Sequence, residues 1–424
     1  MQLNRYEMSC KENIYALIDL FTAYFAVDLY ESIDEGKMLE AVKEAIKYHP
    51  LFGTRIVFEN GLYYFEENPE EPVIFNTENA PGIYGKAENH GYPWMIVLQN
   101  KRMLFYSIHA LTDGVGIFSF CKTVLHIYFK LRGVVFADTA MDFPKGSPEQ
   151  TMENAFLRYA DPECKAFGMP KFSSPVDVAP DWFEPKARRP WRLVIPSDEV
   201  RRFARNSETS VFSVIACILA RTMADAFDIQ DGNIYIRVPV NLRSSFPTAT
   251  DRNFVQGFSL CYDAQRLKDM PDAMVETAFR SQLDLWTDKD NLVQFINRDI
   301  ERINRMKANP EEMRAVLASE QTKKSRAEIL YTHITRPEFS KELMDRISDM
   351  HLAFNAVIKE TISILGITFG SDITLVIQQS AKNDCFIESL RKMLNKREIS
   401  YDLYQFELAA AYTCRKTSEL MKNG

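Results

Sequence analysis

The stretch FYSIHALTDG, residues 105–114, joins the end of an apolar run to a histidine and an Asp-Gly pair. The apolar run at 103–108 predicts a buried strand, and residues 115–131 predict an apolar helix. His109 therefore stands where a strand gives way to a loop and a helix start, a place where a rigid scaffold can hold a side chain towards a cleft. Asp113 is close enough along the chain to orient His109 or to cap the helix. We interpret this stretch as the candidate active site.

Two interpretations of His109 follow from the spacing. An imidazole titrates near neutral pH, so His109 can act as a general base that takes a proton from a hydroxyl, an amine or a thiol. Alternatively, His109 is a hydrogen-bonded histidine at a strand end and Asp113 is only a helix cap. The spacing alone does not separate these two interpretations.

The composition is that of a folded protein with room for two hydrophobic cores. The chain has 424 residues, 46% of them hydrophobic and 12% aromatic, and domains usually contain about 100–200 residues. The net charge of −7 gives no electrostatic reason to expect nucleic acid as the main partner. We therefore expect a globular protein that acts on small molecules or proteins.

The cysteines and the apolar segments indicate a reduced, cytoplasmic, soluble protein. Seven cysteines are scattered without a C-x-x-C pair, so neither a disulfide framework nor a zinc site is indicated, and no metal is expected. The N-terminus lacks the layout of a signal peptide. The most apolar predicted helix, at 211–220, is interrupted by Arg221 and is too short to span a membrane.

Strands and helices alternate irregularly in the N-terminal half. Alternating or apolar runs predict a strand at 21–30 and an amphipathic helix at 34–48, with Asp34 as its N-cap. Asn60-Gly61 predicts a tight hairpin between strands at 53–58 and 62–65. The remaining expected elements are a short strand at 73–75 and a hairpin of strands at 94–99 and 103–108.

The C-terminal half shows the same mixture after a segment rich in proline, serine and charge. That segment, 144–190, predicts a crossing connection with one helix at 149–160. Beyond it the expected strands are 191–195, 233–240, 253–262, 361–369 and 373–379, and the expected helices are 197 onwards, 209–227, 271–286, 292–306, 310–318, 338–357 and 386–394. The sequence therefore predicts an α+β (mixed α/β) fold with an N-terminal subdomain at 1–175, a crossing linker at 176–190 and a C-terminal subdomain at 191–424.

A resemblance to a known superfamily extends over roughly residues 10 to 400. HALTDG at 109–114 resembles the H-x-x-x-D-G motif of CoA-dependent acyltransferases, which include chloramphenicol acetyltransferase, alcohol acetyltransferases, polyketide-associated acyltransferases and peptide-synthetase condensation domains. Three further segments are similar to family segments in the same order: HPLFGTR at 49–55, PVNLR and RNFVQGF at 239–258, and ISILG at 362–366.

The sequence also departs from parts of the superfamily. Condensation domains usually carry two adjacent histidines, and here Ile108 occupies the first position. The D-F-G-W-G motif of the plant enzymes is absent, and Ile364 stands in place of the asparagine of S-N-x-G. These departures favour stand-alone, alcohol-acetyltransferase-like members, and simple acyl transfer over peptide condensation.

The resemblance implies two chloramphenicol-acetyltransferase-like subdomains with a tunnel between them. It further implies that His109 removes a proton from a small-molecule alcohol or amine acceptor as that acceptor attacks an acyl thioester. The co-substrate would be acyl-CoA or a phosphopantetheine thioester on an acyl carrier protein, and no cofactor would be bound permanently.

The resemblance also implies supporting roles around the motif, which Gly114 completes. Asp113 would pair with Arg243 and hold the loop, although Arg243 could instead form an ordinary surface ion pair. Ser363 or Thr361 would donate a hydrogen bond to the tetrahedral oxyanion, or would merely face its own strand. Two basic clusters, 186–189 and 323–326, would meet the 3′-phosphate of CoA or an acidic carrier, or form solvated surface.

Two other functions are compatible with the same sequence. A non-catalytic, condensation-like module could retain the fold to bind a carrier protein, which the isoleucine at position 108 allows. A thioester hydrolase would result if water reached the same base.

Overall fold

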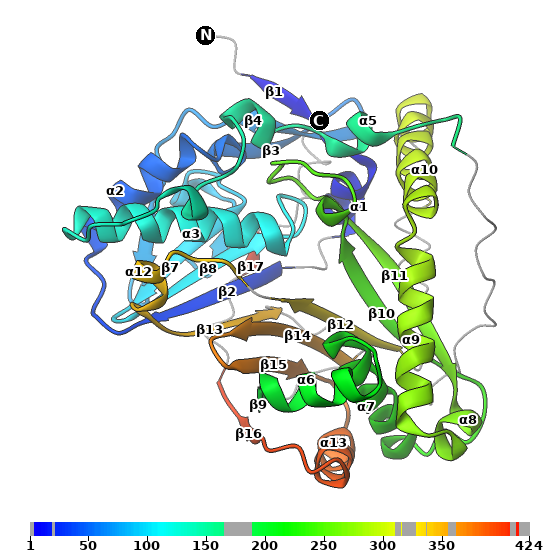
Figure 1. The fold of residues 1–424 in the computed structure, drawn as a ribbon. Coiled ribbons are helices and arrows are strands. Elements are labelled where there is room, and N and C mark those ends of the chain that lie inside the picture. Colours follow the sequence, from blue (N-terminus) through cyan, green and yellow to red (C-terminus); the bar gives the residue numbers. More distant parts are fainter. Residues whose placement is uncertain are drawn as a thin grey trace.

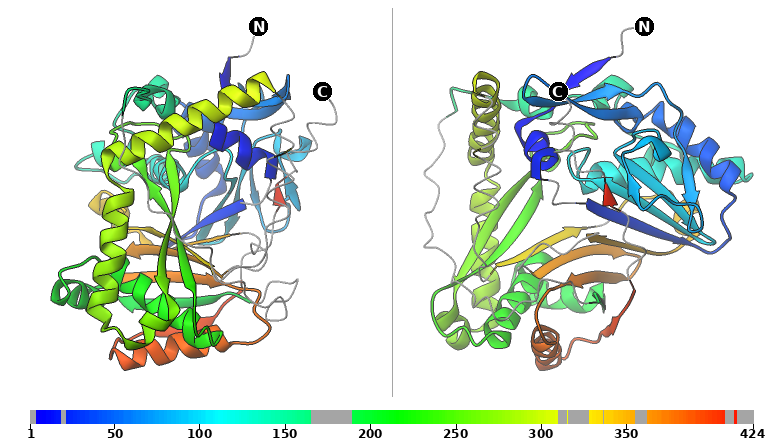
Figure 2. Two further views of the ribbon diagram at one scale, coloured as in Figure 1. Left: turned by 90° about the vertical axis from the view of Figure 1, so that its right-hand side faces the viewer. Right: turned by 180° about the vertical axis from the view of Figure 1, so that it is seen from behind.

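The computed structural model describes residues 4–18, 22–164, 189–309, 315, 328–335, 337–354, 362–407 and 413–414. Two subdomains, each built from a sheet and covering helices, lie against one another (Figures 1 and 2). The expected mixed fold with two subdomains is therefore confirmed. The expected linker lies almost entirely outside the described residues, as do the two basic clusters apart from Arg189.

The N-terminal subdomain contains a five-stranded sheet in the order β13-β2-β8-β7-β5 and a smaller sheet β1-β4-β3. Helices α2 and α3 lie on one face of the larger sheet (Figure 1), where Phe118 of α3 contacts Phe25 of β2. The elements are β1 Arg5–Glu7, α1 Cys10–Ile18, β2 Thr22–Leu29, α2 Glu35–Ile46, β3 Thr54–Glu59, β4 Leu62–Glu67, β5 Ile74–Asn76, β6 Ile83–Tyr84, β7 Trp94–Gln99, β8 Arg102–Ile108, α3 Gly114–Leu131, α4 Pro148–Thr151 and α5 Ala155–Tyr159.

The C-terminal subdomain contains a seven-stranded sheet in the order β11-β10-β12-β14-β15-β9-β16. Helices α6, α7 and α13 lie below this sheet in Figure 1, and α9 and α10 flank the long β10–β11 hairpin. The elements of this half of the chain are β9 Trp191–Pro196, α6 Ser197–Asn206, α7 Val211–Ala226, β10 Asn233–Asn241, β11 Val255–Asp263, α8 Ala264–Asp269, α9 Asp272–Trp286, α10 Lys289–Ala308, β12 Glu328–Ile334, α12 Lys341–Met344, β13 Ile347–Phe354, β14 Ile362–Phe369, β15 Asp372–Gln378, α13 Cys385–Lys396, β16 Asp402–Gln405 and β17 Thr413–Cys414; of these, β13 pairs with β2 and β17 with β6.

The two faces of the seven-stranded sheet pack against different cores. Alternate residues of a strand point to opposite faces, so Ile362 and Ile364 of β14 join the core with α7 and α13. Leu365 and Ile367 of the same strand join the core of the N-terminal subdomain. The face that carries the odd-numbered residues of β14 is therefore the face turned towards the N-terminal subdomain.

Several local predictions are confirmed because short-range chemistry determines them. Asn60 and Gly61 have positive φ values of 51° and 82°, as a two-residue primed turn requires, and they join β3 to β4. Asp34 caps α2 by accepting a hydrogen bond from the backbone N–H of Lys37 at 3.0 Å. The hairpin of β7 and β8, which leads into His109, is also present.

The helix predicted at 338–357 is wrong. Only Lys341–Met344 is helical, and Ile347–Phe354 forms β13, which pairs antiparallel with β2. Met350, His351, Leu352 and Ala353 give this segment the composition of a helix, but long-range pairing with the edge of β2 overrides local propensity. Strand β13 comes from the second half of the chain but completes the N-terminal sheet. The predicted division at 1–175 and 191–424 therefore does not divide the strands between the two sheets.

Two other helix predictions have mixed outcomes, and one helix was missed. The single helix expected at 149–160 is two short helices, α4 and α5, separated at Met152 to Asn154. The helix α1 was not predicted. The helix expected at 310–318 falls outside the described residues, apart from residue 315.

No single helix among the described residues is long and apolar enough to cross a membrane. Helices α6 and α7 reach that length and hydropathy only when they are taken together, and they meet at 94°. The polypeptide of α7 is largely buried in the core of the C-terminal subdomain.

Candidate active site

His109 follows directly on β8, at the border between the two subdomains. Its Nδ1 lies 3.0 Å from the carbonyl oxygen of Thr112. A carbonyl can only accept, so Nδ1 carries the proton and Nε2 is the basic nitrogen. Tyr15 of α1 stacks on the imidazole, with the ring centroids 4.3 Å apart and the planes inclined by 11°. The ring is thus held in one tautomer and one plane.

The surroundings of His109 favour its neutral form. Burial lowers the pKa of His109 from its usual value, and the positive charge of Lys11 acts in the same direction. The hydrogen bond to Thr112 and the negative charge of Asp113 oppose the shift but do not cancel it. A neutral imidazole at physiological pH can accept a proton.

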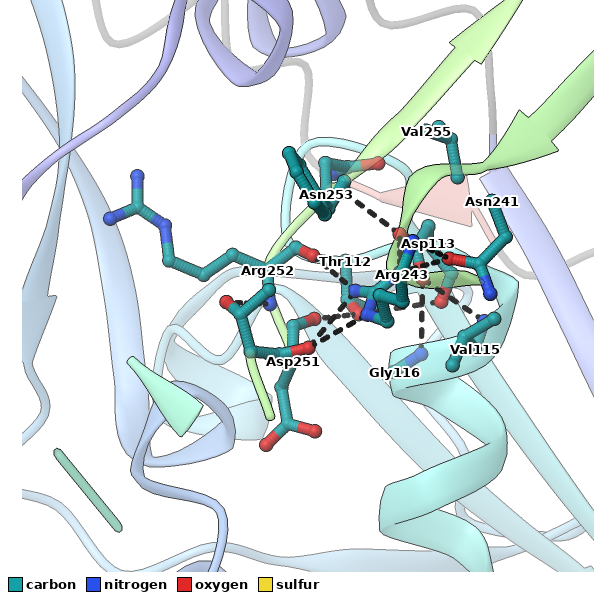
Figure 3. Close-up of polar contacts among 12 residues, drawn as sticks. Thr112, Asp113, Val115, Gly116, Asn241, Arg243, Asp251, Arg252, Asn253 and Val255 are labelled. Atoms are coloured by element: carbon teal, nitrogen blue, oxygen red, sulfur yellow. Dashed lines mark hydrogen bonds and ion pairs between the residues drawn. The ribbon is translucent and has the colours of Figure 1, made fainter. Parts of the chain in front are cut away.

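Asp113 uses both carboxylate oxygens within the protein. Oδ1 accepts from the backbone N–H groups of Val115 and Gly116, at 3.0 and 3.1 Å, and so caps α3. Oδ2 accepts from Arg243 Nη1 at 2.8 Å and from the backbone N–H of Phe254 at 2.9 Å. These contacts are drawn in Figure 3. Four donors thus occupy the buried carboxylate, and Asp113 ties the start of α3 to Arg243 and to the backbone of Phe254.

Arg243 has a partner for each of its five N–H groups. Nη1 donates to Asp113 and to Asn241 Oδ1, while Nε and Nη2 donate to the carbonyl of Thr250 and Nη2 also to that of Arg252. The pair expected between Asp113 and Arg243 is therefore present, with only 1% of the Asp113 side chain and 10% of the Arg243 side chain exposed. It is a buried structural pair and not a surface one.

The segment 251–254 contacts the N-terminal subdomain with four consecutive residues. Asp251 pairs with the buried His49 at 2.7 Å, and Arg252 pairs with Glu12 of α1. Asn253 Nδ2 donates to the carbonyl of His109 at 2.6 Å, and the N–H of Phe254 donates to Asp113. The family-like segments around His49, His109 and residues 252–258 thus meet at one place.

Glycine is required at position 116, and less strictly at position 114. A Cβ at Gly116 would overlap Thr112 Oγ1 and the carbonyl oxygen of Asp251 (Figure 3). A Cβ at Gly114 would meet only Ile334 Cδ1 at 3.5 Å, which is ordinary van der Waals contact. Gly114 was predicted from the sequence and Gly116 was not, because Asp251, which lies close to Gly116, is distant from it in the chain.

The other predicted residues lie on β8 and β14. Ile108, at the position of the first histidine of condensation domains, is buried in the core of the N-terminal subdomain. Ser363 of β14 is fully buried, and its Oγ has no hydrogen-bond partner. By the alternation of β14 it shares a face with Leu365, towards the N-terminal subdomain. Thr361 lies outside the described residues.

Two residues of α1 join the site unpredicted. Lys11 and Tyr15 are four residues apart, which places them on one face of a helix. Lys11 Nζ donates to the carbonyl of Val255 and to Gln256 Oε1. Burial lowers the pKa of Lys11 to about 8 and raises that of Tyr15 to about 12. Their i, i+4 spacing was the available signal, but it does not by itself indicate a neighbouring histidine.

No protein-family model matches this sequence, and no curated protein matches it significantly. Solved structures match most of its length. TRI3 trichothecene 15-O-acetyltransferase from Fusarium sporotrichioides has a TM-score of 0.64 at 10% identity, covering 93% of this chain and 94% of that chain. TRI101 from F. graminearum, complexed with coenzyme A and deoxynivalenol, has a TM-score of 0.62 at 10% identity, covering 94% and 99%.

A condensation domain is also similar. The first condensation domain of the calcium-dependent antibiotic synthetase has a TM-score of 0.57 at 12% identity, covering 93% of this chain and 96% of that chain. The chain shares its overall fold with these two acetyltransferases and with the condensation domain. This agrees with the resemblance carried by the short motifs, and at these identities it concerns the fold alone.

Replacing Asp113 by Ala should lower the free energy of unfolding by about 3–5 kcal/mol, because it leaves the Arg243 charge buried without its partner and removes a helix cap. Asp34→Ala is the matched control, since Asp34 caps α2 but forms no ion pair with any described residue, and it should cost only about 1 kcal/mol. Urea denaturation measures both. Equal losses would contradict the structural role of the pair.

Gly116→Ala should destabilise the fold by several kcal/mol, roughly 2–4, because the methyl group has no space between Thr112 and Asp251. Gly114→Ala should change the free energy of unfolding by less than about 1 kcal/mol. Thermal unfolding of the two variants tests the difference. A Gly116→Ala protein as stable as Gly114→Ala would show that the two segments are not in close approach.

Proposed function

We propose that this protein is an acyltransferase that moves an acyl group from a thioester to an alcohol or amine, with His109 as the general base. The observation that carries the proposal is the hydrogen bond from His109 Nδ1 to the carbonyl of Thr112, which makes Nε2 the proton acceptor. Support comes from the shared fold, since the similar structure of TRI101 is complexed with coenzyme A and deoxynivalenol.

The chemistry requires one base that first takes and then returns a proton. Nε2 of His109 removes the proton from the acceptor O–H or N–H as the acceptor oxygen or nitrogen attacks the thioester carbonyl carbon. The tetrahedral intermediate carries the negative charge on the former carbonyl oxygen. When it collapses, the C–S bond breaks, and the leaving thiolate takes the proton from the imidazolium.

The neighbouring residues would have positioning roles. Asp113 and Arg243 hold the loop that carries His109, and Gly114 opens the helix behind it. Ser363 is proposed as a donor to the oxyanion, because its hydroxyl is buried without a protein partner and such a group gains most from a ligand acceptor. The tunnel that would admit the two substrates stays a prediction.

The donor would be acyl-CoA or an acyl carrier protein, used as a co-substrate rather than held as a cofactor. Ile108 leaves a single histidine at the motif, which favours a small-molecule alcohol or amine as acceptor over a second carrier-bound amino acid. The subdomain limits 1–175 and 191–424 stay a prediction about the course of the chain, with β13 as a strand of the second part that pairs in the N-terminal sheet.

His109→Ala should reduce acyl transfer by about 10²–10⁴-fold, the usual contribution of a general base. The assay follows free thiol release and product mass with a panel of acyl-CoAs offered to alcohols and amines. His90→Asn is the control, because His90 lies in a loop with φ 56°, which asparagine tolerates, and it should retain full activity.

Other outcomes of this assay would replace the proposal. Free acid formed at the same rate with and without an acceptor would identify a thioester hydrolase. Binding of an acyl carrier protein without thioester consumption would identify a non-catalytic binding module. Transfer that is unchanged in His109→Ala would refute the role of His109.

The pH dependence of kcat/KM should show an acid limb with a midpoint below 6.5. The pKa of His109 is lowered by burial, so the imidazole stays neutral, and able to accept a proton, until the pH falls below that lowered value. Activity is therefore kept near pH 6.5 and lost at lower pH. A midpoint at or above 6.5 would contradict the buried, neutral histidine.

A further inference from the structure

One row of side chains crosses the seven-stranded sheet on the face turned towards the N-terminal subdomain. The register places Arg237 of β10 beside Leu330 of β12, Leu330 beside Ser363 of β14, and Ser363 beside Gln378 of β15. Neighbouring strands are roughly 5 Å apart, so Arg237 lies roughly 10 Å from Ser363. The guanidinium of Arg237 and the unpartnered hydroxyl of Ser363 therefore belong to one row on the same face of the sheet.

Arg237 is exposed in the middle of a strand whose neighbouring residues, Ile236 and Val238, are buried. The described part of the chain gives its guanidinium no hydrogen bond and no ion pair. An exposed arginine without a carboxylate partner is commonly just solvated. Whether Arg237 can instead bind a ligand depends on where its side chain lies.

The side chain of Arg237 leans towards the end of the β10–β11 hairpin that contacts α1. In the strand register, the direct neighbour of Arg237 on β11 is Ser259. The Nε of Arg237 lies 3.8 Å from where a Cβ of Gly257 would stand, and Gly257 is two residues along β11 from Ser259. That lean is towards Val255, whose carbonyl accepts from Lys11. Because position 257 is a glycine, no side chain separates the guanidinium from this end of the hairpin.

The electrostatic effect of Arg237 on Lys11 and Tyr15 agrees with this placement. Burial is the largest influence on both groups: it lowers the pKa of Lys11, where the positive charge of Arg237 acts in the same direction, and it raises the pKa of Tyr15, where the charge of Arg237 opposes it. Tyr15 stacks directly on His109. Arg237 therefore acts within short range of the two residues that line the imidazole from α1.

The nearby acids leave the charge of Arg237 uncompensated. Asp113 is saturated by Arg243 and by backbone donors, and Glu12 by Arg252. Asp299 of α10 is the remaining acid; burial raises its pKa to about 6, which leaves it largely ionised near physiological pH, and the strongest charge acting on it is that of Lys11, not that of Arg237. The site beside His109 therefore has a positive potential.

We propose that Arg237 binds a carboxylate carried by one of the two substrates, either the acyl acceptor or the acyl group, and so selects an anionic substrate. A guanidinium presents two parallel N–H groups that match a carboxylate. The phosphates of CoA are a poorer fit, because a pantetheine arm separates them from the thioester that must lie at His109. This inference rests on the acyl transfer proposed above.

Matched substrate pairs test the proposal on both substrates. On the acceptor side, 4-hydroxybutyrate is compared with 4-hydroxybutyramide, and 4-aminobutyrate with 4-aminobutyramide. On the acyl side, succinyl and butyryl groups are compared, each as the CoA thioester and as the N-acetylcysteamine thioester, which carries no phosphate. Wild type, Arg237→Ala, Arg237→Lys and the control Arg280→Ala, an exposed arginine of α9, are assayed in parallel.

We expect wild type to prefer the carboxylate in one arm, and Arg237→Ala to lose about 10- to 100-fold in kcat/KM for it while the neutral partner is unchanged. Arg237→Lys should recover part of the loss, and Arg280→Ala should behave as wild type. The arm that responds identifies which substrate carries the anion. Equal rates for both members of every pair, or a uniform loss in Arg237→Ala, would overturn the proposal, as would a loss confined to CoA thioesters.

Direct binding separates this inference from the proposed reaction. Calorimetric titration of the succinyl and butyryl thioesters, and saturation-transfer NMR with the acceptor pairs, need no turnover. If no transfer occurs but wild type binds the carboxylate members more tightly through Arg237, the anion site stands and the acyltransferase proposal fails. If transfer occurs and neither rates nor binding distinguish the pairs, the anion site fails and the reaction stands.

Discussion

The candidate site depends on the buried pair of Asp113 and Arg243. Moving two opposite charges out of water costs several kcal/mol for each ion, and their attraction offsets this only when their remaining hydrogen-bonding groups are also satisfied. Here the carboxylate has four donors and the guanidinium has an acceptor for every N–H. The pair is therefore intolerant of displacement, and it fixes the start of α3 against the end of β10.

The segment 251–254 extends this constraint to the imidazole. Its hydrogen bonds to the N-terminal subdomain follow one another along the backbone, so none can shift without disturbing its neighbours. His49, the partner of Asp251, is also held by Thr123. The hydroxyl of Thr123 donates to the carbonyl of Asp142, so it must accept from His49 Nε2, while Nδ1 faces Asp251. The imidazole of His49 is thus held from both sides, by Thr123 at Nε2 and by Asp251 at Nδ1.

The sequence was sufficient where the chemistry is local. An Asn-Gly pair determines its own turn, Asp34 caps its own helix, and the spacing of His109 and Asp113 places both on one loop. The partner Arg243 was accessible only through a resemblance, since no local rule relates positions 113 and 243. Lys11, Tyr15 and Asn253 were missed because their approach to His109 depends on how α1 and the β10–β11 hairpin pack. Residues 347–354 were predicted to form a helix for the same reason, because their own composition does not show that they pair with the edge of β2.

The position of β13 has a consequence for how the protein is made. Ser348 donates to the carbonyl of Asp28, a residue 320 positions earlier in the chain. During synthesis β2 therefore emerges long before its neighbour, and one edge of the first sheet stays unpaired in the meantime. Closing so long a loop is slow, and an exposed strand edge can pair with other chains. The N-terminal half should accordingly need either rapid completion of the chain or the help of a chaperone, and should aggregate when it is expressed alone.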